Sequence, residues 1–272
     1  MEGNMKRMVV VAMVVLIVHL SASQAGFGQV LQPGEVLQYK VKWNFLRLGT
    51  IILRTELDTS AADSGCYRLI LIVKSNPALM FISLREYNET VINGQDPHSL
   101  LYWGNHFNGD DSNVINYSYD PAVHRAQCFE RDLRTGELKY NTTLDNAPPY
   151  VEGASLIFYA RCKSHSGKMY GVPTLIGSEL HKTRLEFDGG REELSVAAFP
   201  QPLRALKYTG FADWKGGSSA GMSGEFTGWV SDDNASVPLR AEVKIILGSI
   251  TIELEKWNRP GWNPPSLLQT SF

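Results

Sequence analysis

Apolar and polar residues alternate with a period of two through most of this chain, and this alternation constrains the fold more than any other feature. Residues 37–43 alternate strictly, and residues 239–247 and 249–257 repeat the pattern with Gly248 between them. Successive side chains of a β-strand point to opposite faces of its sheet, so each segment is predicted to have one buried and one wet face. We therefore expect a fold built mainly from β-strands.

Turn-forming residues separate these segments along the chain. Asn93-Gly94, Asp120-Pro121 and Asp188-Gly189-Gly190 favour tight turns because of their backbone preferences. Many short strands at regular spacing predict an antiparallel curved sheet or a half-open β-barrel, with a sandwich as the alternative. The predicted strands cover residues 37–43, 51–57, 67–74, 86–92, 100–106, 114–119, 123–129, 183–187, 204–214, 225–231, 239–247 and 249–257.

One segment lacks the alternation. Residues 154–162 follow the strand-breaking pair Pro148-Pro149 and place Leu156, Tyr159 and Ala160 at positions i, i+3 and i+4. This spacing predicts one short helix with a broad apolar face. The helix is expected either to act as a lid or plug over a pocket or to complete the core, and the sequence leaves both alternatives open.

The N-terminus has the anatomy of a secretory signal peptide. Lys6 and Arg7 precede an apolar run over residues 8–20, and Ser23-Gln24-Ala25 fits a small-x-small cleavage site. The run is shorter than the ~20 residues that a membrane-spanning helix needs. We therefore predict cleavage after Ala25, with the region 27–29 as a second possibility, and export to a bacterial periplasm.

The expected domain organisation follows from this leader. Residues 1–25 form the signal peptide, residues 26–258 a single antiparallel β domain, and residues 259–272 a loose C-terminal tail rich in proline. No later segment is long and apolar enough to span a bilayer, so no integral membrane segment is expected after cleavage.

Three cysteines lie in the predicted domain, Cys66, Cys128 and Cys162. Their spacings match no metal motif, and an odd number leaves at least one unpaired. Two interpretations remain: all three are small buried hydrophobic residues, or two form a disulfide in the oxidising periplasm.

Catalytic motifs are weak in this sequence. Residues 217–221 match G-x-S-x-G, but a predicted strand follows instead of a helix, and the last histidine, His181, precedes the serine. The carboxylate pairs Asp110-Asp111 and Asp232-Asp233 both lie in predicted turns. We therefore predict a protein that is not an enzyme, with no catalytic residues.

Cofactor, metal and nucleic-acid sites are not predicted either. The scattered histidines match no zinc-binding spacing, and no phosphate-binding or dinucleotide motif is present. The formal net charge of −2 provides no basic excess to bind nucleic acid.

A curved sheet left partly open, with a helix across its mouth, creates an apolar pocket. Burying hydrocarbon contributes roughly 0.8 kcal/mol per CH₂ group, so part of an acyl chain can be held without specific polar contacts. The residues predicted to line such a cavity and bind its ligand are Tyr39, Trp43, Leu156, Phe158 and Tyr159.

Several short segments carry a combined signal through their order and spacing, namely residues 34–39, Trp43, Gly49, and residues 155–161, 228–233, 237–239 and 248–250. Together they resemble a family of exported bacterial proteins, the domain-of-unknown-function family 3108. The helix start departs from the family, which tends to have an aspartate where Glu152-Gly153-Ala154 stands here. The resemblance implies a fold similar to periplasmic lipoprotein carriers, a half-open barrel with a helical lid and a hydrophobic cavity.

Two functions follow as hypotheses. The first is a periplasmic protein that binds or carries an apolar ligand, such as a lipid, an acyl chain or a lipoprotein tail. The second is a structural or interaction module of a cell-envelope assembly, with a filled interior and a functional sheet edge or surface patch that contacts envelope proteins.

Overall fold

The computed structural model describes residues 29–59, 65–79, 83–214, 224–245 and 248–265. The predicted signal peptide 1–25, the G-x-S-x-G segment 217–221 and the last residues of the predicted tail, 266–272, lie outside the described residues.

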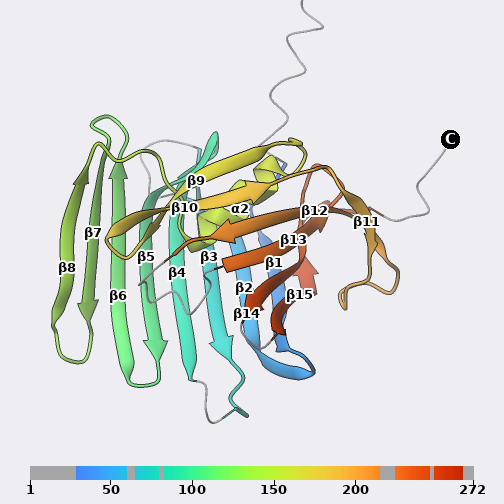
Figure 1. Cartoon of the computed structure of the whole chain (residues 1–272), viewed down its shortest axis with the longest axis horizontal. Coiled ribbons are helices and arrows are strands. Elements are labelled where there is room, and N and C mark those ends of the chain that lie inside the picture. Colours follow the sequence, from blue (N-terminus) through green and yellow to red (C-terminus); the bar gives the residue numbers. More distant parts are fainter. Residues whose placement is uncertain (1–28, 60–64, 80–82, 215–223, 246–247, 266–272) are drawn as a thin grey trace, which may run out of the picture.

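Fifteen strands form one antiparallel sheet (Figure 1), which confirms the predicted mainly β fold. The hydrogen-bonded order is β8-β7-β6-β5-β4-β3-β2-β1-β15-β14-β13-β12-β10-β9, and β11 pairs with β12. The sheet curls without closing into a barrel, so β8 and β9 are the ends of this order. The strands are β1 (Glu35–Trp43), β2 (Leu46–Leu57), β3 (Cys66–Ser75), β4 (Leu84–Asn93), β5 (Asp96–Asn108), β6 (Asp111–Asp120), β7 (Arg125–Asp132), β8 (Leu138–Asp145), β9 (Met169–Ile176), β10 (Glu179–Glu186), β11 (Arg191–Leu194), β12 (Leu203–Ala212), β13 (Gly224–Ser231), β14 (Pro238–Ile245) and β15 (Gly248–Asn258).

Three of these strands were not predicted, β8, β9 and β11. In each the alternating pattern is weak: in β8 the alternation of Leu138, Tyr140 and Leu144 with polar residues is interrupted by Asn141-Thr142-Thr143, β9 contains Gly171 and Pro173, and three of the four residues of β11 are charged. Two of the three stand at the ends of the strand order and the third lies off it. Such positions do not require a continuous apolar face, so the sequence carries little signal for them.

The second half of the sheet folds over the first and encloses the helix α2 (Gly153–Lys163), as Figure 1 shows. Val151, just before the helix, forms a parallel bridge with Thr174 of β9. The amide of Ser99 in β5 donates to the carbonyl of Tyr150, 2.9 Å away. The segment that leads into α2 therefore joins the last strand of the order to the inner face of the first half.

The start of α2 is held by a capping box. The Glu152 carboxylate accepts hydrogen bonds from the amides of Ala154 and Ser155, at 3.0 and 3.1 Å, and the Ser155 hydroxyl accepts one from the Glu152 amide. Thr90 of β4 donates to the same carboxylate at 2.7 Å. Glutamate therefore caps the helix and also fixes it to the sheet.

The helix is enclosed by the core instead of lying at its rim. Phe158 packs in a cluster with residues of β1–β4 and β12–β15, while Leu156 and Tyr159 pack in another with β9, β10 and β12. A third cluster joins Tyr102, Tyr117 and neighbouring residues of β5–β7 to Leu175 of β9. The structure therefore favours the alternative in which the helix completes the core.

A buried ion cluster connects α2 to both ends of the domain. The Arg161 guanidinium donates to both carboxylate oxygens of Glu35, at 2.7 and 3.1 Å, and to the carbonyl of Ser236. Arg259 donates to the same carboxylate from the segment after β15. The charged ends of Glu35 and Arg161 are fully buried, and the Arg161 guanidinium stands 4.8 Å from the centre of the Phe158 ring.

The segment from Arg259 to Pro265 differs from the loose tail expected from its prolines. Arg259 is buried in the ion cluster, and the indole of Trp262 donates to the Asp233 carboxylate at 2.7 Å. Trp262 also packs edge-on against Trp257. The prolines end the sheet, but the cation of Arg259 and the aromatic ring of Trp262 attach this segment to the domain.

Replacing Glu35 by Gln is expected to lower the free energy of unfolding by about 3–5 kcal/mol, because two buried guanidinium groups lose their counter-charge. Urea denaturation followed by circular dichroism measures the loss. The matched control is Glu255→Gln, whose Arg47 partner lies at 2.7 Å in an exposed pair and whose loss is expected to cost less than about 1 kcal/mol. Equal costs for the two variants would show that the buried cluster does not stabilise the fold.

Candidate functional site

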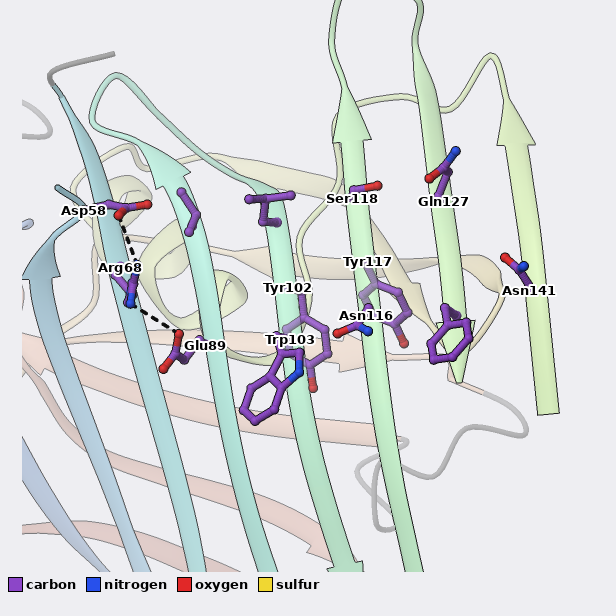
Figure 2. Close-up of a pocket in the computed structure, with 13 residues that line it drawn as sticks. Asp58, Arg68, Glu89, Tyr102, Trp103, Asn116, Tyr117, Ser118, Gln127 and Asn141 are labelled. Atoms are coloured by element: carbon purple, nitrogen blue, oxygen red, sulfur yellow. Dashed lines mark hydrogen bonds and ion pairs between the residues drawn. The ribbon is translucent and has the colours of Figure 1, made fainter. Parts of the chain in front are cut away.

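A hollow in the described part of the structure lies on the outer face of β3–β8, opposite α2 (Figure 2). It is a shallow, open depression with a volume of about 570 Å³, and we call it the outer trough. Its lining combines aromatic, apolar, amide and charged side chains. The lining residues are Asp58, Arg68, Glu89, Val91, Leu101, Tyr102, Trp103, Asn116, Tyr117, Ser118, Gln127, Phe129 and Asn141.

Strand pairing arranges the lining residues in two rows that run across the strands. In the first row, Trp103 pairs with both Glu89 and Asn116, and Phe129 pairs with both Asn116 and Asn141. The first row therefore reads acid, indole, amide, phenyl, amide from β4 to β8. Directly paired residues on one face stand close enough for their side chains to touch.

The second row runs beside the first and is more apolar at one end. Leu101 pairs with Val91 on one side and Ser118 on the other, and Ser118 pairs with Gln127. Val91 and Leu101 form the apolar end, and a hydroxyl and an amide form the polar end. The two rows together make a surface whose chemistry changes along the direction that crosses the strands, from charged and apolar at β4 to uncharged and mostly polar at β7 and β8.

Charged groups are confined to one end of the outer trough. The Arg68 guanidinium lies 3.1 Å from the Asp58 carboxylate and 3.6 Å from that of Glu89, as the dashed lines of Figure 2 mark. Tyr87 donates its hydroxyl to Glu89 at 2.6 Å. Burial, followed by this bond to Glu89, raises the pKa of Tyr87 to about 12, so its hydroxyl stays protonated at neutral pH.

The middle of the outer trough exposes a large aromatic ring. Trp103 is 38% exposed, and its ring meets that of Tyr87 edge-on with centroids 5.8 Å apart. On the inner face behind it, Tyr102 and Tyr117 stack at 4.9 Å. An exposed indole that packs edge-on against a neighbouring ring has less rotamer freedom to lose on binding.

The amides of the outer trough remain available for a ligand. Among the residues that the structure describes, none forms a hydrogen bond with the side chains of Asn116, Gln127 or Asn141. Each side-chain amide offers both donors and an acceptor. They are not needed to stabilise the sheet, and they point to the same side as Trp103 (Figure 2).

The residues predicted from the sequence to bind a ligand lie elsewhere and do not meet in one cavity. Tyr39 and Phe158 are buried in one cluster, and the Tyr39 hydroxyl donates to the carbonyl of Pro238 at 3.1 Å. Leu156 and Tyr159 are buried in another cluster, and Trp43 is half-buried at the end of β1. None of the five lines the outer trough.

The outer trough was not predicted from the sequence, because the alternating pattern marks only the buried face of each strand. The signal was present in β5, where Leu101 and Trp103 alternate with Tyr102, so apolar residues occupy both faces. Tyr102 is buried, whereas Leu101 and Trp103 are exposed. A strand with large apolar residues on its solvent face indicates either a covering element or a binding surface.

Nucleophilic and metal chemistry finds little support in the described part of the chain. Burial raises the pKa of the Cys128 thiol to about 11 and that of Cys162 to about 12, and neither forms a disulfide. Within the described ranges, acidic, histidine and cysteine side chains do not gather in threes around a possible metal position.

Comparison with solved structures places the fold among β-barrel-like proteins. A β-barrel-like protein of the domain of unknown function DUF1849 from Brucella abortus matches with a TM-score of 0.52 and 10% identity, covering 84% of this chain and 98% of that one. A putative exported protein with a YmcC-like fold from Bacteroides fragilis matches at 8% identity over 84% of this chain and 97% of its own, with a TM-score of only 0.30. No curated protein matches the chain.

The chain belongs to the DUF3108 family, described as a protein family of unknown function. The family model matches residues 38–255, which confirms the resemblance found in the sequence. Among the described residues, no helix combines the length and the apolar character needed to cross a membrane.

Phe158→Ala is expected to lower the free energy of unfolding by about 3–5 kcal/mol, because it leaves a cavity beside a ring that is fully buried. Trp103→Ala, on the outer face, is expected to cost less than about 1 kcal/mol. Chemical denaturation of both variants tests whether Phe158 lies in the core and Trp103 on the outer surface. A mild effect of Phe158→Ala, comparable with that of Trp103→Ala, would contradict a helix packed into the core.

The buried thiols are expected to react slowly in the native protein. A rise of the Cys128 pKa from 9.0 to about 11 lowers its thiolate fraction about 100-fold near neutral pH, and the thiolate is the reactive form. Iodoacetamide labelling at pH 8, read by peptide mass spectrometry, should therefore modify Cys128 and Cys162 at least about 100 times more slowly in the folded than in the urea-unfolded protein. Similar rates in the two states would show that these thiols are accessible.

Proposed function

We propose that this chain is an exported, non-enzymatic binding protein of the cell envelope and that it binds its ligand in the outer trough. The observation that carries this proposal is the contrast between the two faces of β3–β8. On the inner face α2 and packed tyrosines fill the space, and on the outer face Trp103 and three amides remain uncovered. Export is supported by the basic, apolar and small-residue segments of the first 25 residues.

A binding role suits the outer trough better than catalysis. Its charged side chains, Asp58, Arg68 and Glu89, already interact with each other. General acid–base or nucleophilic catalysis requires a group poised to exchange a proton or attack, with a suitably shifted pKa. The remaining polar lining consists of amides and hydroxyls, which bind and orient a ligand.

The alternative function is carriage of an apolar ligand in the interior, for which the barrel-like fold is the supporting observation. Room for such a ligand requires α2 to leave the core. That movement would expose Phe158, which alone costs roughly 1.5–3 kcal/mol, and would separate Arg161 from Glu35. A ligand on the outer face requires neither step, so the outer trough is the more economical binding site.

Native mass spectrometry of protein isolated from its host envelope tests this proposal. Asn116→Arg places a long cation in the middle of the outer trough, and Phe107→Arg is the control, on the same face of the same sheet but outside the trough. A bound ligand mass is expected on the wild type and on Phe107→Arg and should be absent from Asn116→Arg. A lipid mass that Asn116→Arg retains and Leu156→Ala loses would instead place the ligand in the interior.

A further inference from the structure

We propose that the outer trough binds a linear β-1,4-linked glycan, with the sugar chain lying across strands β4 to β8. This inference rests on the proposed function, because it assumes that the outer trough is the binding surface. It adds the chemical class of the ligand, its direction on the sheet and the side chains that recognise it.

The spacing of the first row supports an extended sugar chain. Neighbouring strands stand about 4.8 Å apart, so Trp103 on β5 and Phe129 on β7 are separated by about 10 Å, with Asn116 between them on β6. In a β-1,4-linked chain each pyranose ring is turned over relative to the next, so the chain is a straight ribbon that repeats every two rings. Each ring advances by about one strand spacing, and the first row of the outer trough repeats aromatic and amide groups with the same two-step period.

The chemistry of the row matches both kinds of surface that a sugar presents. A pyranose ring has a face of C–H groups, which packs on the electron-rich face of an aromatic ring such as the exposed indole of Trp103. Its hydroxyls both donate and accept hydrogen bonds, as do the side-chain amides of Asn116, Gln127 and Asn141. In the first row, aromatic groups therefore pack on the C–H faces of sugar rings, and the amides between them hydrogen-bond the sugar hydroxyls.

Charge argues against an anionic ligand. Arg68 is the cation of the outer trough, and it already interacts with two carboxylates, Asp58 and Glu89. The lining therefore has a net charge of −1, from one cation and two anions. Nucleic acids and phosphorylated ligands require unpaired cations, whereas a neutral glycan does not.

Strand pairing argues against an extended peptide in the outer trough. A peptide gains affinity on a sheet by adding main-chain hydrogen bonds at an unpaired edge. Strands β4, β5, β6 and β7 are each hydrogen-bonded to neighbours on both sides, so their main chains have no free edge to offer. Only side chains can recognise a ligand on this face, which is the way proteins bind glycans.

The second row indicates which β-1,4-linked glycan binds more tightly. Val91 and Leu101 form an apolar area beside Trp103, and Leu101 is 52% exposed. The methyl group of an N-acetyl substituent would bury part of this area, while the hydroxyl of Ser118 and the amide of Gln127 lie next in the row to bond its carbonyl and N–H. An N-acetylated chain is therefore expected to bind more tightly than an unsubstituted one.

Isothermal titration calorimetry with three hexasaccharides tests this proposal. Chitohexaose carries the N-acetylated β-1,4-linked backbone, cellohexaose the unsubstituted backbone, and maltohexaose the same glucose units in a curved α-linked chain. Chitohexaose should bind most tightly, cellohexaose more weakly, and maltohexaose not measurably.

Variants identify the binding surface. Trp103→Ala is expected to weaken chitohexaose binding about tenfold or more, because a central aromatic residue contributes a large share of the affinity. Phe107→Ala is the matched control: Phe107 lies on the same face of β5 with 42% exposure but outside the outer trough, and its loss should leave affinity unchanged. Circular dichroism of both variants establishes that each is folded.

Several outcomes would overturn the proposal. Absence of binding by both β-linked hexasaccharides at millimolar concentration, equal binding of maltohexaose, or an equal effect of Trp103→Ala and Phe107→Ala would each contradict a glycan site here. If Asn116→Arg still removes the ligand acquired in the host, the outer trough remains the binding surface and only the ligand class is wrong. A ligand that is an extended peptide and is insensitive to Trp103→Ala would place binding at the β8 edge.

Discussion

The buried contact of Glu35 with Arg161 and Arg259 is the interaction on which the rest of the structure depends. These residues lie at the start of β1, in the helix, and directly after the last strand, so the cluster joins parts of the chain that are far apart in sequence. A half-formed cluster would leave charges buried without partners, at a cost of several kcal/mol. The curled sheet and its enclosed helix are therefore expected to form together, and the position of α2 inside the curl is fixed.

The enclosed helix determines which surface is available for binding. Because α2 and the tyrosines of β5 and β6 fill the inner face, the inner side of the sheet provides packing and the outer side of the same strands is left for the binding function proposed here. Trp103 illustrates this division, since its neighbours Tyr102 and Gly104 face the packed interior while its own ring faces solvent. The rigid inner layer in turn holds the rows of the outer trough in register, which a loop-built site would not achieve.

The sequence predicted the strands whose two faces differ most, and it failed at the ends of the strand order. Residues 239–245 and 249–257 alternate cleanly and lie in β14 and β15, whereas β8 is mostly polar, with only Tyr140 and Leu144 packed on the core, and it pairs with β7 alone. The helix was predicted from Leu156, Tyr159 and Ala160, but its burial on all sides depends on contacts with β9–β13 that no local pattern encodes. The outer trough was missed for a related reason: it depends on the registers of six strands, and each contributes only one to three residues.

Native-state hydrogen exchange measures directly whether the helix is part of the core. Amides of residues 153–163 can be compared with those of the central strands β3–β5 across low urea concentrations. A filled interior held by the Glu35 cluster predicts that the helix amides open only with global unfolding, with the same free energy and the same urea dependence as those strands. Exchange of the helix at a much lower free energy, while β3–β5 stay protected, would show that α2 opens as a lid and would contradict a binding function confined to the outer face.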